Sequence, residues 1–102
     1  FCYIIVLGFT SLIDKECNVA ALKFRDMLEK RWEAEYTDIP LRVLGPARYV
    51  ISKVNGRFRW RLILKCRNSP RLRGLMELTL KEAGADKAFG RVIFFADMNG
   101  DP

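Results

Sequence analysis

A tight turn and a two-faced strand are encoded by the stretch Asn55-Gly56-Arg57-Phe58-Arg59-Trp60-Arg61-Leu62-Ile63-Leu64-Lys65-Cys66-Arg67. Asn-Gly is a strong signal for the turn of a β-hairpin, and the residues after it alternate with the period of two that is typical of a β-strand. One face carries the apolar side chains of Phe58, Trp60, Leu62, Leu64 and Cys66. The opposite face carries Arg57, Arg59, Arg61, Lys65 and Arg67, and only Ile63 interrupts it. The stretch therefore predicts a strand with one core face and one basic face.

Two segments before this strand have recognisable patterns. Residues 2–9 are apolar on both faces, which favours a central strand that is covered on each side. Residues 15–35 have the spacing of an amphipathic helix, with Asp14 as its expected N-cap. Residues 41–44 then predict a short strand that ends at Gly45-Pro46, and residues 47–54 predict an extended segment that leads into the turn.

The segments after the basic strand complete the pattern. Ser69 and Pro70 have the chemistry of a helix start, and this helix is expected to run to about Ala83 and to end at Gly84. Residues 91–96 predict a last strand. The order strand–helix–strand–strand–helix–strand predicts an α+β, ferredoxin-like (split β-α-β) fold, in which two helices cover one face of a four-stranded antiparallel sheet. Residues 1–102 are expected to form a single domain.

The positive charge is confined to one region of the chain. Residues 41–75 contain ten Lys or Arg and no Asp or Glu, whereas residues 1–40 and 76–102 each carry a balance of −2. Such asymmetry is typical of a protein that binds nucleic acid or an acidic peptide. The alternative is a solvated sheet face whose charges only keep the protein soluble, although such a surface usually mixes positive and negative side chains.

Composition argues against several other classes of function. The chain has no His, no phosphate-binding glycine loop and no dinucleotide-binding glycine pattern, so we expect no catalytic residues. Cys2, Cys17 and Cys66 are far apart, which favours neither a disulfide framework nor a zinc site. Asp97, Asn99 and Asp101 are expected to belong to a terminal turn without a metal. The apolar run 1–9 is too short to span a bilayer.

The basic residues divide into two candidate sites. Arg57, Arg59, Arg61, Lys65 and Arg67 are the predicted phosphate contacts, since cations on alternate residues of one strand lie about 6.8 Å apart. Arg48 and Lys53, across the turn, could extend this patch, and Phe58 and Trp60 are assigned to the core. Arg71 and Arg73 lie in the first turn of the second helix, where backbone N–H groups also attract anions. They are either an acidic-peptide site or two solvated charges.

The motif Leu44-Gly45-Pro46, followed by Gly56-Arg57-Phe58-Arg59-Trp60-Arg61-Leu62-Ile63-Leu64-Lys65, resembles the C-terminal domain of the PriA-type replication-restart DNA helicase (primosomal protein N-prime). The similarity extends over nearly the whole chain. One departure is the ending Asp97-Met98-Asn99-Gly100, where the family commonly has Asp-Val-Asp/Asn-Pro. The resemblance, and a first residue that is Phe rather than Met, imply a C-terminal domain excised from a longer helicase.

The resemblance implies a function in replication restart. The full-length protein would be an ATP-dependent 3′-to-5′ DNA helicase of the bacterial cytoplasm, with its ATP and zinc sites upstream and no cofactor or membrane contact in this chain. The domain would bind branched or forked DNA and dock on the upstream helicase domains. It would also help to bind the acidic tail of the single-stranded-DNA-binding protein, with Arg71 and Arg73 as candidates. A protein-interaction module with little DNA contact and a ribosomal-type RNA-binding module remain alternatives.

Overall fold

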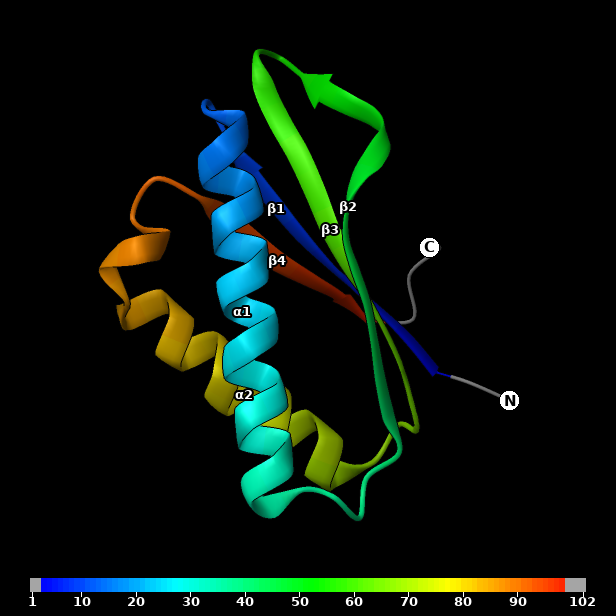
Figure 1. Cartoon of the computed structure of the whole chain (residues 1–102). Helices are drawn as coiled ribbons and strands as arrows, with labels where there is room; N and C mark the ends of the chain where they lie inside the picture. The colour runs from blue at the N-terminus through cyan, green and yellow to red at the C-terminus, as the bar shows by residue number, and fades with distance from the viewer. Residues whose placement is uncertain (1–2, 99–102) are drawn as a thin grey trace.

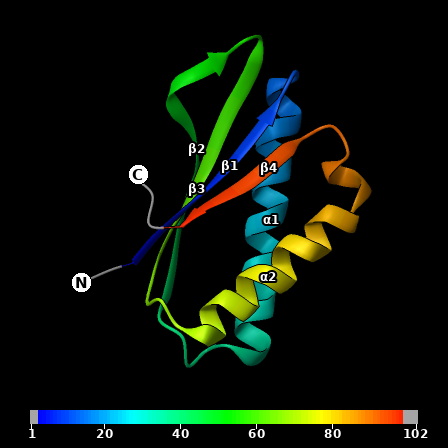
Figure 2. The ribbon, with the colours of Figure 1, turned by 180° about the vertical axis from the view of Figure 1, so that it is seen from behind.

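A computed structural model describes residues 3–98 as a two-layer arrangement of a sheet and two helices. The elements are β1 (Tyr3–Ser11), α1 (Asp14–Glu35), β2 (Leu41–Val54), β3 (Arg57–Cys66), α2 (Pro70–Ala85), a 3-10 turn (Lys87–Phe89) and β4 (Ile93–Met98). The strands pair antiparallel in the order β2-β3-β1-β4, and both helices cover the same face (Figures 1 and 2). The predicted ferredoxin-like fold is confirmed. Neither helix has the length and apolarity that crossing a bilayer requires.

The hydrophobic core lies between the helices and the inner face of the sheet. β1 is a central strand, as its two apolar faces predicted, and Ile5, Leu7 and Phe9 point from it into the core. Phe9 packs against Phe24 of α1 with ring centroids 5.7 Å apart. The helix stripes that the sequence predicted are buried here, in particular Leu72, Leu75, Met76, Thr79 and Ala83 of α2. This core fixes which side of each strand remains open.

Several predicted boundaries differ from the structure. Asp14 is the first residue of α1 and not its N-cap; Ile13 holds the cap position without a side-chain hydrogen bond. The carboxylate of Asp14 accepts hydrogen bonds from other elements instead. The cap of α2 is as predicted, since Ser69 Oγ accepts from Leu72 N at 3.1 Å. That helix ends at Ala85, one residue past the predicted Gly84, and Ala83 is its last buried residue.

β2 is one long strand with two irregularities rather than two separate segments. The first lies at Gly45, where φ is +100° and a Cβ would come within 3.0 Å of the carbonyl oxygen of Arg61. Only glycine fits there, which gives the Leu44-Gly45-Pro46 motif a structural reason. Arg25 of α1 donates a hydrogen bond to the Gly45 carbonyl. The predicted Asn55-Gly56 turn is present, with φ of 52° and 77°.

Candidate nucleic-acid interface

The face of the sheet opposite the helices has a basic half and an apolar half. Register places Arg59 opposite Thr10 of β1 and Arg61 opposite Gly8, so these guanidinium groups start from the open side of β3. Trp60, Leu62 and Leu64 alternate with them and join the core or pack against it. The predicted division of β3 into a core face and a basic face is therefore confirmed as geometry.

Tyr49 of β2 organises the centre of the basic half. The guanidinium carbon of Arg59 lies 4.2 Å from the Tyr49 ring centroid, and that of Arg61 lies 5.5 Å from it. Arg59 also donates a hydrogen bond to the carbonyl of Ile51 at 3.3 Å. Burial raises the pKa of the Tyr49 hydroxyl, so the ring remains neutral. Two cations are thus held side by side under one aromatic ring.

The two ends of the row are built differently. Arg57 donates hydrogen bonds to Oγ1 of Thr10 at 3.3 Å and to its carbonyl at 3.1 Å, which ties this guanidinium to β1. At the other end, Lys65 is exposed and lies directly opposite Arg42 of β2. Arg42 was not among the predicted site residues. The alternation in residues 41–44 is the signal that could have placed it on the open face.

Arg48 and Lys53 do not extend the arginine row, which corrects the expected patch. Both are paired with residues of the helix-side face of β3: Arg48 with Trp60, and Lys53 with Phe58. Each cation lies over the ring of its partner, at 5.0 Å and 4.9 Å. The four-residue bulge of β2 between these two pairs turns their side chains away from the open face. A DNA contact by either residue stays a prediction.

Asp14 of α1 bonds to both Arg48 and the indole on which Arg48 packs. Its carboxylate accepts a hydrogen bond from Arg48 at 2.6 Å and another from Nε1 of Trp60 at 2.8 Å. These donors hold the pKa of Asp14 below its usual value. The indole therefore has a structural partner, and Trp60 packs against the core as expected. Phe58 lies on the same face of β3 but does not pack against the core cluster; its ring lies under Lys53.

The apolar half of the open face lies on β1 and β4. Phe95 is paired with Gly8, and a Cβ at Gly8 would come within 2.3 Å of the Phe95 ring. The outer end of the ring therefore occupies the space that a side chain at Gly8 would need. Phe95 and its neighbour Ile93 remain 43% and 59% exposed. An apolar patch beside a row of cations is typical of a docking surface.

The second candidate site lies where α1 ends and α2 begins. Arg71 forms a two-pronged contact with Asp38, at 2.9 Å for both oxygens, and lies 4.8 Å from the Tyr36 ring centroid. This guanidinium holds the pKa of Asp38 below its usual value. Arg67 belongs here and not to the strand row, because β3 ends at Cys66. Arg67 and Arg71 line a pocket of about 340 Å³ together with Ile39, Pro40, Pro70, Asp38 and Ser69.

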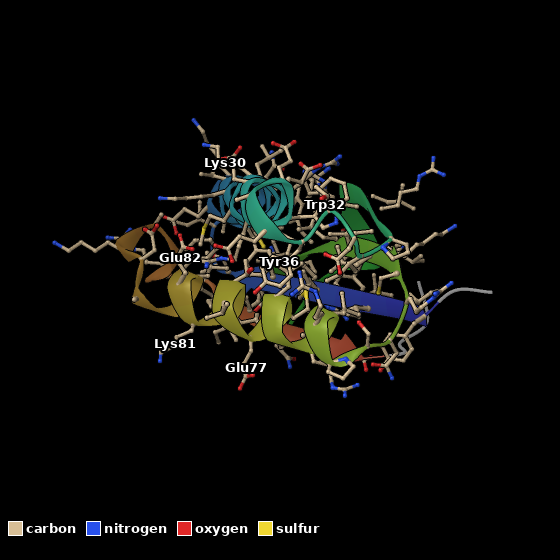
Figure 3. The ribbon with its side chains drawn as sticks, turned by 90° about the horizontal axis from the view of Figure 1, so that it is seen from below. Lys30, Trp32, Tyr36, Glu77, Lys81 and Glu82 are labelled. Carbon is tan, nitrogen blue, oxygen red and sulfur yellow. The ribbon has the colours of Figure 1, made fainter. Side chains whose placement is uncertain are left out.

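Arg73 lies near this pocket but does not line it. It donates to the side chain of Asn68 at 2.8 Å. In Figure 3, Tyr36 lies between the two helices, whereas Lys30 of α1 and Glu77 and Lys81 of α2 point outward. Arg71 and Arg73 therefore do not form one site. Arg71 lines the pocket, whereas Arg73 bonds to Asn68 in the loop before α2.

The cysteines and the chain end add no third site within residues 3–98. The Cys17 thiol is buried and donates to the Phe9 carbonyl at 2.9 Å, and burial raises its pKa to about 11. Cys66 is also buried. In this part of the chain no three His, Cys, Asp or Glu side chains come together to hold a metal. Cys2, Asn99, Gly100 and Asp101 lie outside the described residues, so the expected terminal turn stays a prediction.

Comparison with known protein families gives the same family as the motif on β2 and β3. The model of the family described as "Primosomal protein N C-terminal domain" matches residues 4–100. The chain belongs to this family. The match includes every described element except the first residue of β1, and it confirms the resemblance suggested by Leu44-Gly45-Pro46 and the basic strand. No curated protein sequence matches the chain.

Solved structures share the fold at low sequence identity. A de novo designed protein with a ferredoxin fold is 9% identical with a TM-score of 0.64, and the match covers 99% of this chain and 87% of that one. A second designed protein is 10% identical with a TM-score of 0.60 and full coverage of both chains. A hydantoinase/carbamoylase family amidase from Burkholderia ambifaria is 10% identical with a TM-score of 0.66, over 95% of this chain and 27% of the amidase. These likenesses concern the fold alone.

Proposed function

We propose that this chain is the C-terminal domain of a primosomal replication-restart helicase and that it binds branched or forked DNA through the open face of its sheet. The observation that carries the proposal is the row Arg57, Arg59, Arg61 and Lys65, which faces away from the helices. The row belongs to a stretch of sequence, residues 41–75, that contains no acidic residue. Arg42 joins the row opposite Lys65. The family match supports a role in the primosome.

The chemistry of the row suits phosphates rather than bases. Arginine forks bind phosphate oxygens with two hydrogen bonds, and contacts of this kind position DNA without reading its sequence. Arg59 and Arg61 are held in place by Tyr49, so less side-chain freedom is lost on binding. Like charges that face each other destabilise a sheet. An anionic partner would remove this cost at Arg42 and Lys65.

The rest of the helicase would lie in parts of the longer protein upstream of this domain. We propose that ATP and zinc are bound there, and that this chain contributes binding without catalysis or a cofactor of its own. The apolar half of the open face, with Ile93 and Phe95, would dock on the upstream domains. Such a protein would work in the bacterial cytoplasm beside the chromosome.

Charge reversal in the row is the test of this proposal. The variant Arg57→Glu/Arg59→Glu/Arg61→Glu should bind a forked DNA at least about tenfold more weakly. The slope of log affinity against log salt should become shallower by about 0.9 for each phosphate that the variant no longer binds. Binding is measured by fluorescence anisotropy at several salt concentrations. Circular dichroism checks the fold, because Arg57 also bonds to Thr10.

Two further variants make the result specific. Lys15→Glu/Lys81→Glu/Lys87→Glu changes the net charge equally at exposed helix-side positions and should retain most of the binding. Arg42→Glu/Lys65→Glu reverses two exposed cations of the row that make no ion pair within residues 3–98, and it should weaken binding. Unchanged affinity in both row variants, with intact folds, would exclude this face as the DNA site.

A second candidate function is the binding of an acidic peptide, and the pocket beside Arg71 favours it. Ile39, Pro40 and Pro70 supply apolar walls, and Arg67 and Arg71 supply positive charge. This combination suits a peptide end that carries both carboxylates and an apolar side chain, such as the acidic tail of the single-stranded-DNA-binding protein. Titration of an acidic peptide against Arg71→Ala and Arg73→Ala, with DNA as competitor, separates this function from DNA binding.

A further inference from the structure

The β2 strand of the β2–β3 hairpin carries two apolar side chains, Val50 and Ile51, that belong neither to the core nor to the arginine row. Arg48 pairs with Trp60 and Lys53 pairs with Phe58, so four residues of β2 (Tyr49–Ser52, the β2 bulge) face a single residue of β3. Figure 1 shows this part of β2 bowing away from β3 before the strand returns to the turn. Within the bulge, Val50 is 95% exposed and Ile51 is 64% exposed. The bulge thus holds two β-branched apolar side chains in water.

The bulge is anchored rather than loose. Its first residue, Tyr49, packs its ring on Arg59 and Arg61, and the carbonyl of Ile51 accepts a hydrogen bond from Arg59. Bulges of this kind aim a side chain at a defined direction and are typical of functional positions. Because these two side chains are exposed, the folded chain lacks the stabilisation that their burial would give. The arrangement therefore indicates a surface that is buried by a partner.

The charges beside the β2 bulge favour one class of partner. Arg59 donates a hydrogen bond to the carbonyl of Ile51, and both Arg59 and Arg61 lie against the ring of Tyr49. No Asp or Glu occurs in the sequence between Leu41 and Leu75. The last base pair of a duplex at a branch point offers the complementary surface, since its uncovered base face is apolar and phosphates surround it. Apolar side chains are known to act as wedges against base steps when nearby cations hold the backbone.

We propose that the β2 bulge is a wedge that packs Val50 and Ile51 against the terminal base pair at the junction of a branched DNA. The inference rests on the proposed DNA binding and goes beyond it, because it assigns recognition of the branch point to two apolar residues. The arginine row would hold the backbone of any duplex. The wedge would distinguish a junction from continuous DNA.

The test uses the 102-residue chain and a fork with 2-aminopurine in the junction base pair. Binding of the unmodified chain should raise the fluorescence of this base through partial unstacking, and should leave it unchanged when the probe is inside the duplex. Val50→Ser/Ile51→Ser should abolish the rise and lower the preference for fork over duplex by about fivefold or more. Its affinity for continuous duplex should stay within about twofold, because the phosphate contacts remain.

A matched control and a gain-of-function variant sharpen the result. Leu22→Ser/Leu78→Ser removes two exposed apolar side chains from the helices and should retain the fluorescence rise, whereas Val50→Phe should increase it. No rise with the unmodified chain, or a rise that survives Val50→Ser/Ile51→Ser, would overturn the wedge while fork binding stands. Absence of fork binding in the unmodified chain would overturn the proposed function itself. Binding of the β2 bulge to an upstream helicase fragment, without any junction signal, would overturn the wedge in favour of a protein contact.

Discussion

At the scale of single residues, Asp14 connects the start of α1 to one cation of the basic region. Its carboxylate accepts from both Arg48 and Trp60, and so keeps one cation of the ten-residue basic set on the helix side of the sheet. Sequence patterns placed Asp14 near the start of the helix correctly. They could not show that two donors distant in sequence would take its oxygens, because only the folded register brings β2 and β3 to the end of α1.

This carboxylate should make stability depend on pH in acid. The pKa of Asp14 is lower in the folded chain than in the unfolded chain, so its contribution is present above the unfolded value of about 3.9 and is lost as pH falls through the folded value. Asp14→Asn should lose stability less steeply than the native chain between about pH 5 and pH 2. Urea unfolding across this range measures both slopes. Parallel curves would show that Asp14 contributes nothing to acid sensitivity.

At the scale of elements, the contact between the end of α1 and the start of α2 governs the second candidate site. Arg71 is already engaged by Asp38 and by the carbonyl of Glu35. A carboxylate from a peptide would therefore have to compete with Asp38 for the same guanidinium. The sequence indicated Arg71 as an anion site, but it could not reveal this competitor, which comes from the loop after the other helix.

Removing the competitor should strengthen peptide binding. Asp38→Asn leaves Arg71 without its carboxylate partner and should raise the affinity for an acidic peptide by about threefold or more, whereas Arg71→Ala should lower it. Isothermal titration with the same peptide measures both, and Asp26→Asn, at an exposed site on the outer side of α1, is the matched control. If Asp38→Asn and Arg71→Ala shift affinity in the same direction, the peptide does not use this guanidinium as proposed.

Element types were easier to predict than the irregular parts of β2. The order of strands and helices follows from periodicity and from caps such as Ser69, because these depend on neighbours in sequence. The bulge at Tyr49–Ser52 depends instead on cross-strand partners, namely Trp60 and Phe58. For this reason the alternation on β3 predicted the face of Arg57, Arg59, Arg61 and Lys65, whereas Arg67 lies beyond the end of the strand. It did not show that Arg48 and Lys53 pair with the helix-side residues Trp60 and Phe58.

At the scale of the whole molecule, the sheet separates two kinds of surface. The helices bury one face, and the open face divides into the basic half on β3 and the apolar half on β4. β1 lies between the two halves. One partner could therefore bind the basic half while another binds the apolar half of the same face. This division is consistent with a domain that contacts DNA while docked on a larger protein.

Docking through the apolar half should depend on Ile93. Ile93→Lys places a charge on the exposed part of β4 and should weaken binding to an upstream helicase fragment about tenfold or more, since burying one such side chain contributes about 1.5–3 kcal/mol. Leu78→Lys makes the same change on the outer side of α2. Surface plasmon resonance compares the two. Greater loss with Leu78→Lys would place the docking surface on the helices.

The β2 bulge also bears on how this domain varies among its relatives. Ala47 and Arg48 are paired with β3 before the bulge, and pairing resumes at Lys53 and Val54. Residues added or removed between Arg48 and Lys53 would therefore leave the pairs on either side in place. Loop insertions of this kind cost little when the flanking structure is kept. The size of the bulge can therefore increase or decrease during evolution while the sheet, the core and the arginine row stay the same.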